Sequence, residues 1–164
     1  MRFGRLIPRL TVCLLVLADP AMACDVGAAA ATLNSIRRQL VDGEVKRIDL
    51  VKISDRLLAS IPISPEHFAT YSSERSSLTL TQRDAADLAT AMTALSPAQS
   101  AYEPDLRWQL VLFDGAGNQL HTIFFSKRYL QGRGRTGYLD GNRCQFTAAT
   151  IGTPAVVKWL QKRL

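Results

Sequence analysis

Two runs rich in apolar residues, joined by a short turn, constrain the fold of this chain more than any other feature. The runs are Leu106–Phe113 and Gln119–Phe125, and the connection over 114–118 contains two glycines and an aspartate. Glycine and aspartate in such a connection are typical of a tight turn between antiparallel strands. The sequence therefore predicts a hairpin at about 106–126, at the centre of an antiparallel sheet.

Helices and strands alternate before this hairpin. Apolar residues that recur every three or four positions indicate a helix, and runs rich in β-branched residues indicate a strand. The apolar stripe of the helix after Thr81 includes Leu88, Met92 and Leu95, and the helix is expected to end before Pro97. In chain order we expect a helix over 28–41, a strand over 45–53, a short helix over 65–71, a strand over 77–80, a helix over 82–95, a polar loop over 96–105, the central hairpin, a shorter hairpin around 138–146 and a final helix from 155.

This order of elements predicts the fold class. Early alternation of helices and strands, followed by strands that pair through tight turns, is typical of α+β proteins. We expect a small antiparallel β-sheet of four to six strands, with helices packed mainly on one face.

Residues 1–23 have the three zones of a secretory signal peptide. Three arginines precede the uncharged, mostly apolar run Leu10–Ala18, and Ala21 and Ala23 form a small-x-small cleavage site. The run is too short for a bilayer-spanning helix, which needs roughly 20 residues. We expect cleavage after Ala23, which leaves one α+β domain over 24–164 that is periplasmic or secreted.

Two cysteines follow the predicted cleavage site. Cys24 and Cys144 form an even pair in a compartment that favours disulfides, so the sequence predicts a Cys24–Cys144 bond. The alternative is that Cys24, as the first residue after cleavage, is lipidated and anchors the protein. Lipidation signals in bacteria usually carry leucine three residues before the cysteine, where this chain has Ala21.

The central hairpin is a candidate contact surface. A symmetric register would place Trp108 opposite Phe124 on the core side and Arg107 opposite Phe125 on the other side. That second side would mix apolar and polar residues, as a surface that a partner covers does. In the alternative interpretation, a helix of the same domain covers it.

A basic segment, Lys127–Arg143, is the second candidate surface. Its net charge is +4, which equals the net charge of residues 24–164, so the remainder of those residues is neutral. Glycines between the arginines allow close approach of the backbone, and the guanidinium fork suits carboxylate or phosphate. The alternative is a solvated loop whose charges aid solubility. The candidate binding residues of this segment are Arg128, Tyr129, Arg133, Arg135, Tyr138 and Arg143.

Catalytic residues are not evident. His67 falls in the predicted short helix and His121 in the middle of a strand, where each reads as a structural residue. The sequence lacks the H-E-x-x-H, C-x-x-C and G-x-S-x-G motifs of zinc hydrolases, dithiol oxidoreductases and elbow-serine hydrolases. We therefore expect no metal and no cofactor.

Three functions follow from these features. The first is an exported, non-catalytic protein of the inhibitor or immunity type, which binds a macromolecule of the cell envelope or exterior through the basic segment and the aromatic hairpin. The second is a binding module for an anionic envelope glycan or lipid. The third is a hydrolase without a recognisable motif. The net charge is too mild to favour nucleic acid as a partner.

Overall fold

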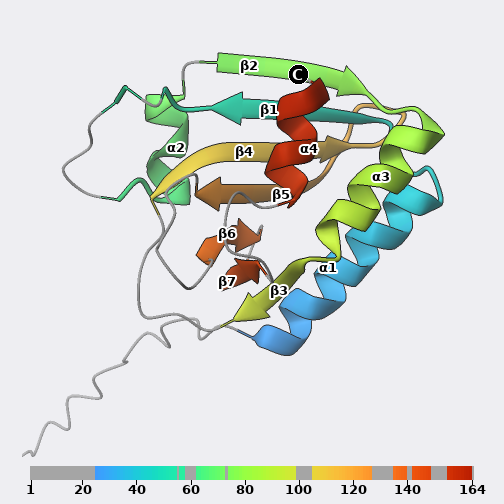
Figure 1. The fold of residues 1–164 in the computed structure, drawn as a ribbon, viewed down its shortest axis with the longest axis horizontal. Coiled ribbons are helices and arrows are strands. Elements are labelled where there is room, and N and C mark those ends of the chain that lie inside the picture. Colours follow the sequence, from blue (N-terminus) through green and yellow to red (C-terminus); the bar gives the residue numbers. More distant parts are fainter. Residues whose placement is uncertain are drawn as a thin grey trace, which may run out of the picture.

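The computed structural model describes residues 25–54, 56–57, 62–72, 74–98, 105–126, 135–139, 142–148 and 155–163, and for 135–139 and 142–148 it describes the backbone. Figure 1 shows the arrangement of the elements. In chain order these are α1 (Val26–Val41), β1 (Arg47–Lys52), α2 (Pro65–Tyr71), β2 (Glu74–Thr79), α3 (Gln82–Met92), β3 (Leu95–Ala98), β4 (Leu106–Phe113), β5 (Gln119–Ser126), β6 (Arg135–Leu139), β7 (Asn142–Ala148) and α4 (Ala155–Arg163).

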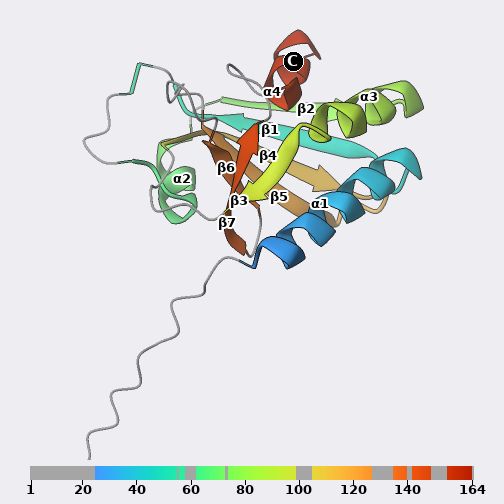
Figure 2. The same cartoon turned by 60° about the horizontal axis from the view of Figure 1, so that its bottom comes forward.

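The strands form one sheet in the order β2-β1-β4-β5-β6-β7-β3, and every neighbouring pair is antiparallel. Three helices, α1, α3 and α4, lie together on one side of the sheet, and α2 lies apart from them at the end where β4 begins (Figures 1 and 2). The predicted α+β class is confirmed. The predicted second hairpin is formed by β6 and β7.

The sheet has seven strands rather than four to six, and β3 accounts for the difference. The sequence predicts Leu95 on the stripe of the preceding helix and residues 96–98 in a polar loop, and both predictions are wrong. The helix ends at Met92, and Leu95–Ala98 pairs with β7. An edge strand accommodates Pro97 because its outer side needs no N–H donor.

Local signals set the ends of the long helices. The side chain of Asp25 accepts a hydrogen bond from the Ala28 backbone and caps α1. After α1, Gly43 adopts a positive φ of 73°, a conformation that glycine tolerates best. In α3 the side chain of Thr81 accepts from the Asp84 N–H, while the Asp84 carboxylate accepts from the Thr81 N–H.

The main core lies between the sheet and α1, α3 and α4. The strands contribute residues such as Ile48, Leu110 and Phe125, and α1 and α3 contribute Ile36 and Leu88, all of them fully buried. The amphipathic stripes of the helices face this side, as the spacing of their apolar residues predicts. This core holds the three helices against the sheet.

Two β-bulges change the register of the central hairpin. Leu106 lies opposite Ser126 and Phe113 opposite Gln119, but between them Trp108 pairs with Phe125 rather than with Phe124. The first irregularity adds Arg107 to β4, and the second adds Leu120 to β5. Each bulge inserts one residue that has no partner on the opposite strand. The symmetric register is therefore wrong by one residue in the middle of the hairpin.

A second core lies on the opposite face of the sheet, under α2. Phe68 of α2 packs edge-on against Phe124 of β5, with ring centroids 5.4 Å apart. The other buried members of this second core are Val51, Ile53, Ile63 and Leu106. Helix α2 thus covers one end of the second face.

Candidate functional site

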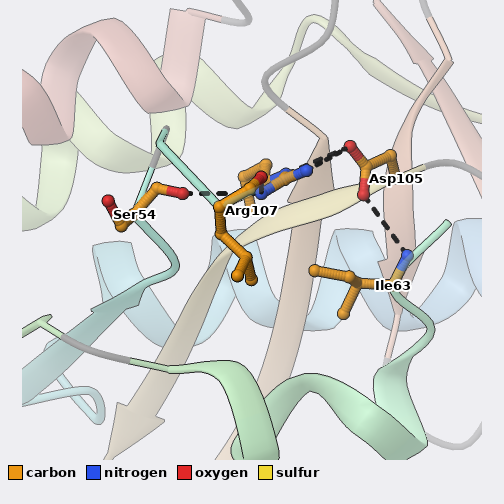
Figure 3. Close-up of polar contacts among 5 residues, drawn as sticks. Ser54, Ile63, Asp105 and Arg107 are labelled. Atoms are coloured by element: carbon orange, nitrogen blue, oxygen red, sulfur yellow. Dashed lines mark hydrogen bonds and ion pairs between the residues drawn. The ribbon is translucent and has the colours of Figure 1, made fainter. Parts of the chain in front are cut away.

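The most elaborate polar arrangement among the described residues is centred on Arg107, the extra residue of the first β-bulge. Its guanidinium is buried, with 7% of the side chain exposed, beside the second core. Figure 3 shows Arg107 between Asp105 and the backbone near Ser54. We call this arrangement of Asp105, Arg107 and their backbone partners the clasp.

The clasp satisfies both charged groups. Arg107 donates from Nε and Nη2 to one carboxylate oxygen of Asp105, at 3.1 and 2.8 Å. Its Nη1 donates to the Leu57 carbonyl at 3.0 Å, and the Ser54 carbonyl lies at 3.5 Å. The other oxygen of Asp105 accepts from the Ile63 N–H at 3.3 Å (Figure 3). A buried charge is stable when it is paired and hydrogen-bonded in this way.

These bonds join two distant parts of the chain. The backbone adds two more: the Ile53 N–H donates to the Arg107 carbonyl, and the Leu106 N–H donates to the Ile63 carbonyl. The clasp therefore holds the segments on both sides of residues 58–61 against the start of β4. Because its donors and acceptors are used internally, the clasp is a structural element rather than a ligand site.

The predicted contact surface on the hairpin requires correction. Arg107 is buried in the clasp, and Phe125 is fully buried in the main core. Ile123, which the symmetric register places on the same exposed side, is also fully buried. The shifted register turns Ile123 and Phe125 towards the helices, so neither Arg107 nor Phe125 offers its side chain to a partner.

The structure describes only part of the basic segment. Arg135 and Tyr138 belong to β6 and Arg143 to β7, where the backbone is described. Arg128, Tyr129 and Arg133 lie outside the described residues. The strands of this segment lie inside the sheet, between β5 and β3.

The signal peptide and one of the two cysteines also fall outside the described residues. Cys144 belongs to β7, whereas residues 1–24 are not described. The first turn of α1, which begins two residues after Cys24, lies near β3 and β7 in both views (Figures 1 and 2). The disulfide stays a prediction.

A polar cluster that the sequence did not indicate lies on the half of the second face that α2 does not cover. Ser77 of β2 donates to Asp49 of β1 at 2.7 Å, and the Arg47 guanidinium lies 3.2 Å from the same carboxylate oxygen. The guanidinium also lies over the Phe113 ring, 4.1 Å from its centroid. The opposite charges of Arg47 and Asp49 neutralise one another across this cluster, although the buried Arg47 Nε has no hydrogen-bond partner among the described residues.

Three further titratable side chains, Asp114, His121 and His67, have hydrogen-bond partners within the domain. Hydrogen bonds from the Asn118 side chain and backbone, and from the Ala116 backbone, lower the pKa of Asp114. Asp114 is therefore the cap of the hairpin turn. His121 lies 2.9 Å from the Gln39 side chain, and His67 lies 3.1 Å from the Ser64 hydroxyl.

No group of three or more histidine, cysteine and acidic side chains is placed to hold a metal ion in the part of the chain that the structure describes. Within the same residues, no helix is both long and apolar enough to cross a bilayer.

The sequence contained a signal for the clasp. Asp105 and Arg107 are two residues apart at the start of a strand, and in a regular strand residues at this spacing lie on the same face. A charged pair at the beginning of a buried strand is therefore a candidate for an internal ion pair. Arg47 and Asp49 have the same spacing at the start of β1, whereas their contact with Ser77 depends on strand order, which local patterns do not provide.

Comparisons of the whole chain with protein-family models, with curated proteins and with solved structures find no match.

Proposed function

We propose that this protein is exported and binds an acidic macromolecule of the cell envelope or exterior, as an inhibitor or immunity-type protein does. The observation that carries the proposal is the segregation of charge. The segment Lys127–Arg143 has a net charge of +4, and the remainder of residues 24–164 is neutral. Such a local excess of arginine attracts carboxylates or phosphates and accelerates encounter with them.

The surroundings of this segment support a binding role. The backbone of β6 and β7 is hydrogen-bonded between β5 and β3, so residues 135–139 and 142–143 of the segment belong to the sheet. A binding residue that is mounted on a rigid element loses less conformational entropy when the partner arrives. With Arg107 and Phe125 buried, the proposal rests on the basic segment alone, with Arg128, Tyr129, Arg133, Arg135, Tyr138 and Arg143 as candidate contacts.

Export rests on the amino-terminal sequence. The three-zone pattern of residues 1–23 implies removal after Ala23, and the position of the start of α1 near β7 supports a bond from Cys24 to Cys144 (Figures 1 and 2). On the chain-entropy account, a bond that closes so long a loop stabilises the fold by about 4–5 kcal/mol. Intact-mass measurement tests both points: a start at Cys24 and a loss of two hydrogens are expected, whereas an added diacylglycerol would contradict the disulfide.

The decisive experiment compares two double variants in the capture of exported and envelope proteins. Arg133→Ala with Arg135→Ala should weaken retention of the captured partner about tenfold or more, because each charge-assisted hydrogen bond is worth about 1.5–3 kcal/mol. Lys158→Ala with Lys162→Ala is the matched control, since it removes the same charge from exposed positions of α4. The control should change retention less than about twofold.

Three outcomes would contradict the proposal. Equal loss in the two double variants would show that only net charge matters. Unchanged retention in the arginine variant would exclude the basic segment. Capture of purified envelope glycan or lipid, without any protein, would contradict a protein partner. The protein would then be a binding module for an anionic glycan or lipid.

A further inference from the structure

The two edges of the sheet differ in how their unpaired backbone groups are protected. The edge strand β3 has four residues, and one of them is Pro97, which has no N–H to donate. The other edge strand, β2, has six residues without proline, and its register with β1 is unbroken from Glu74 to Thr79. Natural sheets usually protect an edge with proline, a bulge, charged side chains or a covering element, and of these β2 has only the charges of Glu74 and Arg75 at its beginning.

No described element covers β2. The strand forms the upper border of the sheet in Figure 1, and β1 is its neighbour on the inner side. Its residues are exposed, apart from the half-buried Leu78. An edge of this kind is a template on which an extended chain can add a further strand.

The hydrogen-bond pattern identifies which residues of β2 face outwards. The Leu80 N–H donates to the Lys46 carbonyl, so the even-numbered residues of this strand bond to β1. The bond from the Ile53 N–H to the Arg107 carbonyl agrees, because it directs the odd-numbered residues of β1 towards β4. The outward-facing residues of β2 are therefore Arg75, Ser77 and Thr79.

We propose that the β2 edge accepts an extended, acidic peptide segment of a partner protein as an additional strand. Arg75, Ser77 and Thr79 each present one N–H and one carbonyl to that strand, and backbone groups of this kind are matched best by another backbone. The proposal concerns a site separate from the basic segment, and it does not depend on the function of that segment.

The charge of Arg75 at the β2 edge favours an acidic partner. Among the described residues, no carboxylate pairs with Arg75, whereas Glu74 forms an ion pair with Lys52 at 3.5 Å and Asp49 is engaged by Arg47 and Ser77. Arg75 is thus the uncompensated charge beside the outward-facing groups. A second copy of this chain fits less well, because it would bring a second Arg75 and another net positive charge to the same edge.

The test uses the isotopically labelled exported form of the protein and two synthetic peptides of seven residues, one alternating threonine and glutamate and the other alternating threonine and lysine. The acidic peptide should shift the amide resonances of Arg75, Ser77 and Thr79 in a saturable way and slow their hydrogen exchange. It should bind about two- to fivefold more tightly than the basic peptide, since one exposed charge pair changes the affinity by about that factor.

Variants at two positions separate the backbone effect from the side-chain effects. Ser77→Pro should weaken binding of the acidic peptide about tenfold, because it removes an outward N–H from the middle of the edge. Ser77→Ala is the matched control: it also removes the hydroxyl bond to Asp49 but keeps the N–H, so its affinity should stay within about twofold of the original. Arg75→Glu, which changes a side chain and leaves the ladder intact, should reverse the preference between the two peptides.

Several results would overturn the proposal. These are saturable shifts that spare β2, the absence of any saturable shift, equal affinity of Ser77→Pro and Ser77→Ala, an unchanged peptide preference in Arg75→Glu, or concentration-dependent broadening of β2 resonances without peptide, which would indicate a second copy. If Ser77→Pro does not fold, Arg75→Glu decides alone. Arg133→Ala with Arg135→Ala should bind the acidic peptide at β2 as the original chain does, so failure of this site and failure of the basic segment are distinguishable.

Discussion

The two apolar cores of the sheet differ in size, in cover and in the polar groups that accompany them. The main core is covered by three helices and consists almost entirely of apolar side chains. The second core has six buried apolar residues under one helix of seven residues, and the clasp of Asp105 and Arg107 lies beside it. The difference suggests that burial of apolar area suffices for the main core, whereas the smaller one depends on specific hydrogen bonds.

Two neighbouring phenylalanines of β5 test this comparison, because they point into different cores. Phe125→Ala should lower the free energy of unfolding by nearly 5 kcal/mol and Phe124→Ala by about 3 kcal/mol, within the usual range for phenylalanine. The reason is that Phe125 is fully buried in the main core, whereas Phe124 remains 9% exposed in the second. Urea denaturation measures both values. A larger loss for Phe124→Ala would support the symmetric register instead.

Removal of one partner of the clasp should have the next largest effect. Arg107→Ala should lower the free energy of unfolding by about 3 kcal/mol, because it leaves the Asp105 carboxylate without its cation. The double variant Asp105→Leu with Arg107→Met should lose less than Arg107→Ala, since an apolar pair leaves no buried charge. Arg75→Ala, at an exposed arginine, serves as control and should change stability by less than about 0.5 kcal/mol. Equal effects of Arg107→Ala and this control would show that the clasp does not stabilise the second core.

The smallest effects concern the caps of the helices that cover the two cores. Thr81→Ala should lower the free energy of unfolding by about 1 kcal/mol, because Thr81 and Asp84 exchange hydrogen bonds at the start of α3. Ser64→Ala should cost only a few tenths of a kcal/mol by the same scale, since the Ser64 hydroxyl contacts His67 and makes no side-chain cap bond to α2. Thermal unfolding of both variants measures the difference. A larger loss in Ser64→Ala would mean that the short helix is the more strongly capped one.

The fold class and most elements could be predicted from the sequence, because each has a local signal. The glycines and aspartate of residues 114–118 mark the hairpin, and the Thr81–Asp84 pair marks the start of α3. The local sequence does not predict strand β3, because Leu95 continues the apolar spacing of α3 and a proline such as Pro97 is unfavourable in a strand. Its formation depends on the partner β7, which is about 50 residues away in the chain.

The surface of the central hairpin and the position of Arg107 were harder to predict, because both depend on the register of β4 and β5. Nothing in the local pattern of β4 or β5 shows that Arg107 and Leu120 lack opposite partners, and a shift of one residue exchanges the two faces of a strand. The symmetric register predicts Ile123 and Phe125 on an exposed surface, whereas the structure places both in the main core. The basic segment, in contrast, is a feature of composition, and its prediction does not depend on register.

The two bulges also affect how the hairpin can tolerate insertions and deletions. They lie on opposite strands, so the offset that Arg107 introduces in β4 is cancelled by Leu120 in β5, and the strands are in step again at the turn. Only the block between the bulges is displaced, and that block supplies aromatic residues to both cores. An insertion or deletion of one residue in one strand would shift the pairing of β4 with β5 at the turn, unless a matching change occurred in the other strand. Length changes in these two strands are therefore expected to arise in pairs.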